Sequence, residues 1–153
     1  MPKLFQENLD VRPEDLVAGL LDACDIKEPP TDGQLVFDFL KLERNTLPRE
    51  VVTTLSSTFN IDPKVQAILH LRERLVLIHP NLENHSERCT WASLHEVGHY
   101  VLPDHRELLF KCSWQDLNQL TQKRLETEAN RFAADLIFQN ELFTRKEPMS
   151  RSR

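Results

Sequence analysis

Cysteine is scarce in this chain, and the cysteines lie too far apart to form a metal site. The 153 residues include three of them, Cys24, Cys89 and Cys112, and no two have the close spacing of zinc-binding cysteine pairs. An odd number at such distances does not make a disulfide framework either. We therefore expect reduced thiols, as in a cytoplasmic protein.

Long apolar runs and an excess of positive charge are also missing. No apolar run approaches the roughly 18 residues of a membrane-spanning helix, and the first residues, Met-Pro-Lys-Leu-Phe-Gln-Glu, lack the apolar core of a signal peptide. The formal net charge is −5 and the sequence pI is about 5.7, so no basic face for nucleic acid is implied. We expect a cytoplasmic protein that neither spans a membrane nor binds nucleic acid directly.

The remaining composition is that of an ordinary globular protein, without internal repeats or low-complexity blocks. Apolar residues make up 40% and charged residues 28% of the chain, and the length suits one domain with a hydrophobic core. We predict a single domain over residues 1–153, with flexible ends at residues 1–11 and 146–153. The second of these ends is basic and rich in serine and arginine.

Apolar residues at helical spacing predict three helices in the first third of the chain. The first begins at Pro13 and carries acidic residues in its first turn. The second follows Pro29-Pro30, where Thr31 and Gln34 fit a capping box. The third is short and opens at Pro48. No chemistry is apparent in these helices, and we interpret their apolar residues as core.

The hydrophobic period then changes to that of strands. Residues 65–71 alternate, and Leu75–His79 is rich in β-forming residues up to Pro80. We predict a hairpin with its turn near Arg72–Arg74, a turn that lacks glycine. We expect the strand Leu75–His79 to present an open edge, to which an extended peptide can add.

The stretch His95-Glu96-Val97-Gly98-His99 carries the clearest chemistry. On a helix, residues four apart share a face, so both imidazoles can bind one metal ion. Two neutral imidazoles suit Zn²⁺, and Glu96 can take a proton from water that the metal activates. The alternative is a chance match to a short motif. The flanking residues nevertheless predict a largely apolar, buried helix that stops at Pro103. Two histidines and a glutamate inside such a helix need a partner.

Two glutamates on the last predicted helix, from about Trp114 or Gln115 to Phe138, compete as a third zinc ligand. Glu128 shares a charged face with arginine and aspartate residues at helical spacing, so a surface position explains it. Glu126 lies on an apolar stripe, where a carboxylate needs a metal or, alternatively, a buried salt bridge. The other members of that stripe are Ala129, Asn130, Ala133 and Ile137.

No residue stands out as a stabiliser of an oxyanion. Between Pro103 and the last helix we expect an irregular stretch, which includes His105. The candidates His79, His85, Tyr100 and His105 are each better explained as surface or loop residues.

Taken together, the segments His95–Leu102 and Glu126–Ile137 resemble the ImmA/IrrE metallopeptidases. In that family a His-Glu-x-x-His helix precedes a Glu-x-x-Ala-Asn-x-Phe-Ala-Ala helix. The likeness covers about residues 12–140, and the predicted hairpin is similar to the short sheet that precedes the zinc helix. It implies an α+β fold: a small zincin-like, gluzincin-type domain with N-terminal helices, a short antiparallel sheet and two helices that carry the ligands.

The resemblance also implies roles for individual residues. His95, His99 and Glu126 look like the ligands of one Zn²⁺ per chain, and Glu96 looks like the general base. Asn130 occupies a place where related zinc peptidases have a residue that orients a ligand histidine.

The function implied by the resemblance is a cytoplasmic zinc endopeptidase whose substrate is a helix-turn-helix repressor of a phage, a mobile element or a stress regulon. A second hypothesis is a non-proteolytic, zinc-containing docking module that binds a repressor or toxin. The small size and the segment Leu136–Gln139, where the family often reads Leu-Leu-Met-Pro, leave this alternative open. A purely structural zinc site is a third reading, in which Glu96 has no role.

Overall fold

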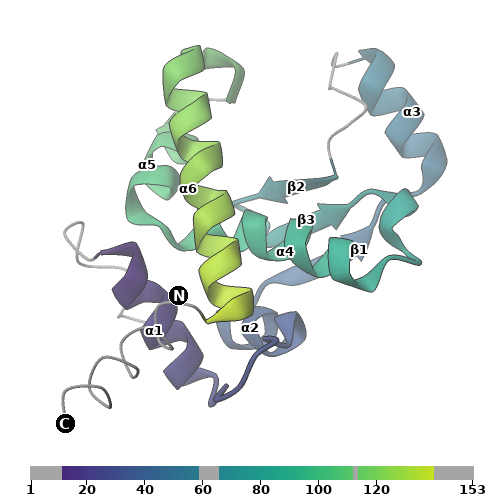
Figure 1. Ribbon diagram of the computed structural model, residues 1–153. Helices are drawn as coiled ribbons and strands as arrows, with labels where there is room; N and C mark the ends of the chain where they lie inside the picture. The colour runs from purple at the N-terminus through teal and green to yellow at the C-terminus, as the bar shows by residue number, and fades with distance from the viewer. Residues whose placement is uncertain (1–11, 59–65, 112–113, 140–153) are drawn as a thin grey trace, which may run out of the picture.

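The computed structural model describes residues 12–58, 66–111 and 114–139, and these residues form an α+β domain (Figure 1). The predicted fold class is therefore confirmed. The flexible ends predicted at residues 1–11 and 146–153 lie outside the described residues. In chain order the elements are α1 (Pro13–Ala23), α2 (Gly33–Leu40), β1 (Glu43–Thr46), α3 (Arg49–Thr58), β2 (Ala67–His70), β3 (Leu75–Ile78), η2 (Pro80–Leu82), α4 (Ser86–Val101), α5 (Pro103–Lys111), η3 (Trp114–Asp116) and α6 (Gln119–Phe138).

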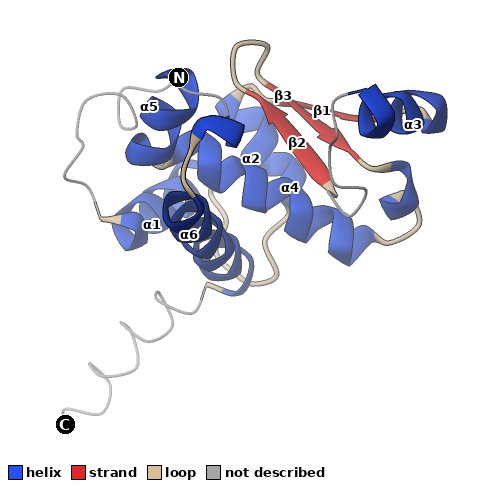
Figure 2. Ribbon diagram, turned by 90° about the horizontal axis from the view of Figure 1, so that it is seen from above, coloured by secondary structure: helices blue, strands red, loops and turns tan. Residues whose placement is uncertain are grey.

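Helix α4 is the central element, because it lies between the small sheet and α6 (Figure 2). One side of α4 packs on β2 and β3, while α6 crosses the other side and α1 packs against α6. The core is formed where these layers meet, and its large side chains are almost completely buried. It includes Leu20, Phe37, Val97, Phe132 and Leu136.

The first three helices lie where they were predicted, but not all of their apolar residues belong to the core, because Leu35 on α2 and Val51 on α3 are exposed. Helix α1 begins at Pro13 and buries its apolar stripe. The predicted capping box at the start of α2 is wrong, because the side chain of Asp32 accepts the N–H of Gln34 at 2.9 Å. Thr31 instead faces α6, where its N–H donates to the carbonyl of Ile137 at 3.1 Å. This contact fixes the end of α6 against the start of α2.

The predicted hairpin is present as the antiparallel pair β2 and β3. Its four-residue loop, Leu71–Arg74, turns without glycine because Arg74 adopts a left-handed conformation with φ of 51°. The N–H of Arg74 closes the loop by donating to the carbonyl of Leu71 at 3.2 Å.

The prediction that the strand Leu75–His79 has the open edge is wrong. The strand order is β1-β3-β2, with β1 parallel to β3, so β3 is central and the sheet is mixed rather than antiparallel. The sequence of β1, Glu-Arg-Asn-Thr, has no apolar alternation that would identify it as a strand. In the described part of the chain, β2 is the edge strand on the side of the hairpin.

The stretch after Pro103 is helical, not irregular as predicted. Proline is tolerated in the first turn of a helix, so Pro103 ends α4 and at the same time begins α5. The last helix starts at Gln119, later than predicted, because the side chain of Asn118 caps it by accepting the N–H of Thr121 at 2.8 Å. No helix within the described ranges is both long and apolar enough to cross a membrane.

Candidate metal centre

Helices α4 and α6 approach each other closely at Gly98, inside the His-Glu-x-x-His motif. A Cβ atom added at Gly98 would lie 3.2 Å from Cδ1 of Phe132 and 3.3 Å from Cα of Ala129. These separations are shorter than ordinary packing contacts, so the absence of a side chain lets α6 lie directly on α4. The crossing point is one turn from Glu126, and it brings this carboxylate over the two histidines.

We expect a side chain at Gly98 to move Glu126 on α6 away from the two histidines on α4. Gly98→Val adds three carbon atoms against the backbone of Ala129, and overpacking of this kind costs about 1–3 kcal/mol. Urea unfolding of the metal-free protein should show this loss, and chelator competition should show weaker zinc binding because Glu126 is displaced. The matched control is Gly33→Ala on α2, where an added Cβ has only ordinary contacts, the nearest at 3.7 Å. Equal zinc affinity in Gly98→Val and wild type would contradict this view of the helix crossing.

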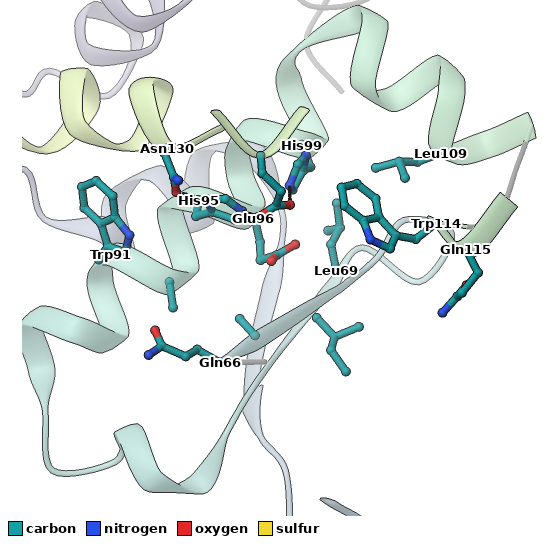
Figure 3. Close-up of a pocket in the computed structure, with 14 residues that line it drawn as sticks. Gln66, Leu69, Trp91, His95, Glu96, His99, Leu109, Trp114, Gln115 and Asn130 are labelled. Carbon is teal, nitrogen blue, oxygen red and sulfur yellow. Dashed lines mark hydrogen bonds and ion pairs between the residues drawn. The ribbon is translucent and has the colours of Figure 1, made fainter. Parts of the chain in front are cut away.

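The predicted ligand atoms converge on one point, and Figure 3 labels the two histidines among them. Nε2 of His99 lies 3.0 Å from Oε1 of Glu126, and Nε2 of His95 lies 3.2 Å from Oε2. The ligand atoms of all three residues lie within 4.8 Å of one another. His99 is buried, whereas 48% of the Glu126 side chain is exposed, so the cluster opens to solvent on the side of the carboxylate.

This arrangement fits a small divalent cation. In a tetrahedral zinc site with bonds of about 2.0–2.1 Å, neighbouring ligand atoms are roughly 3.3 Å apart. The two histidine–carboxylate separations are already close to this value. Two imidazoles and one carboxylate are also a donor set typical of zinc, and three protein ligands leave a coordination position for water or substrate.

The charges of the three residues are strongly coupled. Burial alone would raise the pKa of Glu126, but hydrogen bonds to His95 and His99 and their positive charge lower it to about 2. Burial alone would lower the pKa of His95, but the hydrogen bond to Glu126 and the charges of Glu96 and Glu126 raise it above 6.5. Glu126 is therefore held as a carboxylate that attracts positive charge to this point, which a metal ion can supply.

Glu96 lies beside the cluster and extends into the adjoining cleft (Figure 3). Burial raises its pKa to about 8, and the positive charge of His95 offsets only part of this rise. A divalent cation at the cluster would favour the carboxylate and lower that pKa again. A partly buried carboxyl group whose charge depends on a neighbouring cation is suited to taking up and releasing a proton.

In each histidine of the cluster, Nδ1 is within hydrogen-bond distance of a residue other than Glu126. Nδ1 of His95 lies 2.8 Å from Oδ1 of Asn130, so Asn130 contacts one of the two histidines, as the resemblance to the ImmA/IrrE family implied. Nδ1 of His99 lies 3.0 Å from Nδ1 of His105, a contact that was not predicted. Both Nε2 atoms are thus left to face Glu126.

Several residues lie in places that differ from the sequence-based interpretation. His105 and Tyr100 are buried, so neither is a surface or loop residue. Glu128 does pair with Arg124 at 2.7 Å, as its charged face predicted, but its other oxygen lies 3.4 Å from Nε2 of His105. The surface explanation of Glu128 is therefore incomplete. The ring of Trp114, 5.9 Å from that of His99, was also missed.

A cleft of about 620 Å³ adjoins the cluster and is large enough for a peptide segment. His95, Glu96 and His99 line it, and so do residues of β2. None of the four oxyanion candidates lines it, and neither do Phe138 and Gln139, which lie at the C-terminal end of α6. From β2 the lining residues include Ile68 and Leu69. Those from other parts of the chain include Gln66, Trp91, Leu109, Trp114 and Gln115.

A His-Glu-x-x-His helix crossed by a second helix that supplies a carboxylate, beside a small sheet, defines a zincin-like metallopeptidase domain. The model of the peptidase M78 family, described as the IrrE N-terminal-like domain, matches residues 50–152. The chain belongs to this family, as its resemblance to the ImmA/IrrE metallopeptidases predicted. No curated protein and no solved structure matched the chain.

Proposed function

We propose that this protein is a zinc-dependent endopeptidase that cleaves a helix-turn-helix transcriptional repressor. The observation that carries the catalytic part is the convergence of His95, His99 and Glu126 on one point, with Glu96 beside it in an open cleft. Membership of a peptidase family supports the same activity. The choice of substrate rests on the resemblance to the ImmA/IrrE proteins, and such a substrate places the reaction in the cytoplasm.

The chemistry divides between the metal and the protein. When bound by His95, His99 and Glu126, zinc supplies a Lewis acid that polarises the peptide carbonyl and acidifies water. Glu96 takes the proton of the attacking water and then delivers it to the leaving amine. Asn130 keeps the proton of His95 on Nδ1, so that Nε2 stays available as a ligand.

The edge of β2 supplies a docking site for the substrate backbone. The N–H of His79 donates to the carbonyl of Gln66 at 2.8 Å, which makes these two residues a hydrogen-bonded pair of the antiparallel ladder. Because such pairs alternate with non-hydrogen-bonded pairs, the N–H and C=O groups of Ala67 and Leu69 point away from β3. An extended substrate segment can therefore add to this edge beside Glu96.

Ala67→Pro tests this docking mode. Proline removes the N–H that faces the open edge and leaves the ladder bonds to β3 intact, which is the position where an edge strand tolerates proline. We expect a fall of about tenfold in kcat/KM for a peptide substrate, as for the loss of one backbone hydrogen bond, with zinc content unchanged. Ala67→Val, which retains the N–H, is the control. The same activity in both variants would exclude substrate pairing at Ala67.

The experiment that tests the function uses the zinc-loaded protein and candidate helix-turn-helix repressors, beginning with any that is encoded next to the gene for this protein. The two proteins are incubated together, and the fragments are identified by mass spectrometry. We expect one or a few defined cleavage sites, and none when a chelator is present. A stable complex with an intact repressor would instead support the docking module, and neither binding nor cleavage would remove the repressor from consideration.

A further inference from the structure

A row of side chains extends behind His99, on the side away from the metal cluster. Nδ1 of His99 lies 3.0 Å from Nδ1 of His105, and Nε2 of His105 lies 3.4 Å from Oε2 of Glu128. The other oxygen of Glu128 accepts a hydrogen bond from Arg124 at 2.7 Å, and Arg124 also pairs with Asp104 at 2.7 Å. The row thus joins a ligand histidine on α4 to α5 and then to the charged face of α6.

The geometry assigns the proton at each position of this row. If Nε2 of His99 binds a metal ion, its only proton is on Nδ1, and this N–H must donate to Nδ1 of His105. Nδ1 of His105 is then an acceptor, so the proton of this ring is on Nε2 and points to the carboxylate of Glu128. The opposite direction would place a proton on Nε2 of His99 and block the metal.

Among the residues that the structure describes, Nδ1 of His105 has no hydrogen-bond partner other than His99. Its side chain has no exposed surface, so water does not compete for Nδ1 from solvent. A buried imidazole is costly unless both ring nitrogens are hydrogen-bonded, and here one nitrogen faces His99 and the other faces Glu128. Glu128 lies two positions after Glu126. One turn of α6 therefore contacts both His99, through Glu126, and His105, through Glu128.

We propose that His105, supported by Glu128, is a positioning residue that fixes the tautomer and ring orientation of His99 and thereby sets the metal affinity of the site. This inference rests on the metal centre of the proposed function, and it does not depend on the substrate. Asn130 performs the same task for His95, so each histidine is oriented by a different residue from a different helix. Partners of this kind contribute about 10- to 100-fold to metal affinity.

Zinc affinity, measured by competition with a chromophoric chelator, tests the proposal. His105→Leu replaces the imidazole with an apolar side chain of similar bulk, so the acceptor Nδ1 is lost. We expect zinc binding to be about 10- to 100-fold weaker in this variant. In His105→Asn the side-chain oxygen can take the place of Nδ1, so affinity should return to within about threefold of wild type. The visible absorption of bound Co²⁺ should change in His105→Leu and remain close to wild type in His105→Asn. Glu107→Gln, at an exposed position of α5, is the matched control.

Urea unfolding of the metal-free variants separates positioning from a merely structural role. A structural role would lower the stability of both His105 variants and leave their zinc affinity unchanged, which would overturn the proposal. Equal weakening of zinc binding by leucine and asparagine would overturn it too. Should His105→Leu not fold, Glu128→Ala provides the second test, with an expected loss of several-fold in affinity and a retained fold. Wild-type affinity in Glu128→Ala would then contradict the role of the row.

These outcomes differ from those that test the proposed function. If the wild-type protein binds zinc but cleaves no repressor, the proposed repressor cleavage is contradicted. The role of His105 in zinc affinity can still be measured in that case. A wild-type protein that binds no zinc overturns both proposals.

Discussion

Replacing Glu96 with glutamine should stop peptide cleavage and leave both the fold and the bound zinc in place. Glutamine has the size and hydrogen-bonding capacity of glutamate but cannot take up the proton of water. Because Glu96 lies beside the ligand cluster rather than in it, the three ligand atoms are unchanged. A general base contributes about 10²–10⁴-fold, so we expect the cleavage rate to fall by about a hundredfold or more.

The measurement compares wild type and Glu96→Gln at equal zinc content, using metal analysis, circular dichroism and a cleavage time course on the same preparations. Glu87→Gln is the matched control, since Glu87 lies on the first turn of the same helix and is exposed. Equal cleavage by wild type and Glu96→Gln would exclude Glu96 as the base. Loss of zinc together with activity would instead indicate that Glu96 supports the metal cluster.

The parts of this site that could be predicted are those carried by long, periodic helices. The spacing of His95 and His99 defines a shared face without knowledge of the fold, and the apolar stripe on α6 singled out Glu126. The structure brings all three together. Gly98, within the motif, explains why the two helices approach so closely, but its contact with Ala129 and Phe132 appears only once the helices are packed.

The parts that could not be predicted depend on short or polar elements. Strand β1 is a polar tetrapeptide whose strand character comes from pairing with β3, which is a tertiary effect. Because β1 was missed, the wrong strand was predicted to have the open edge. Pro103 was taken as the stop of one helix and the start of an irregular stretch, although proline also begins helices.

Missing α5 had the larger consequence for the site. A histidine in a supposed loop offers no periodicity to argue from, so His105 was interpreted as a surface residue when it is buried against His99. The account of Glu128 from the sequence was also incomplete. Its helical neighbour Arg124 accounts for one carboxylate oxygen, and only the fold reveals that His105 occupies the other.

Replacing a ligand histidine with alanine should reduce zinc from about one ion per chain to none that survives dialysis, and the two histidines should differ in their effect on the fold. Two remaining donors are too few to retain a zinc ion that normally takes three protein ligands. Removal of His95 exposes Oδ1 of Asn130, a residue on the surface that water can satisfy. Removal of His99 leaves Nδ1 of the buried His105 without its partner, which costs about 1–3 kcal/mol.

We therefore expect His99→Ala to be less stable than His95→Ala when both are unfolded by urea in the presence of a chelator. Glu126→Ala should also lose most of its zinc affinity, because the carboxylate is the shared partner of both imidazoles. Thr127→Ala, at the next position of α6 and exposed, should bind zinc like wild type. If Glu126→Ala retains one tightly bound zinc, the third ligand is not on this turn of α6. If the two histidine variants unfold at the same urea concentration, the contact between His99 and His105 does not stabilise the metal-free protein.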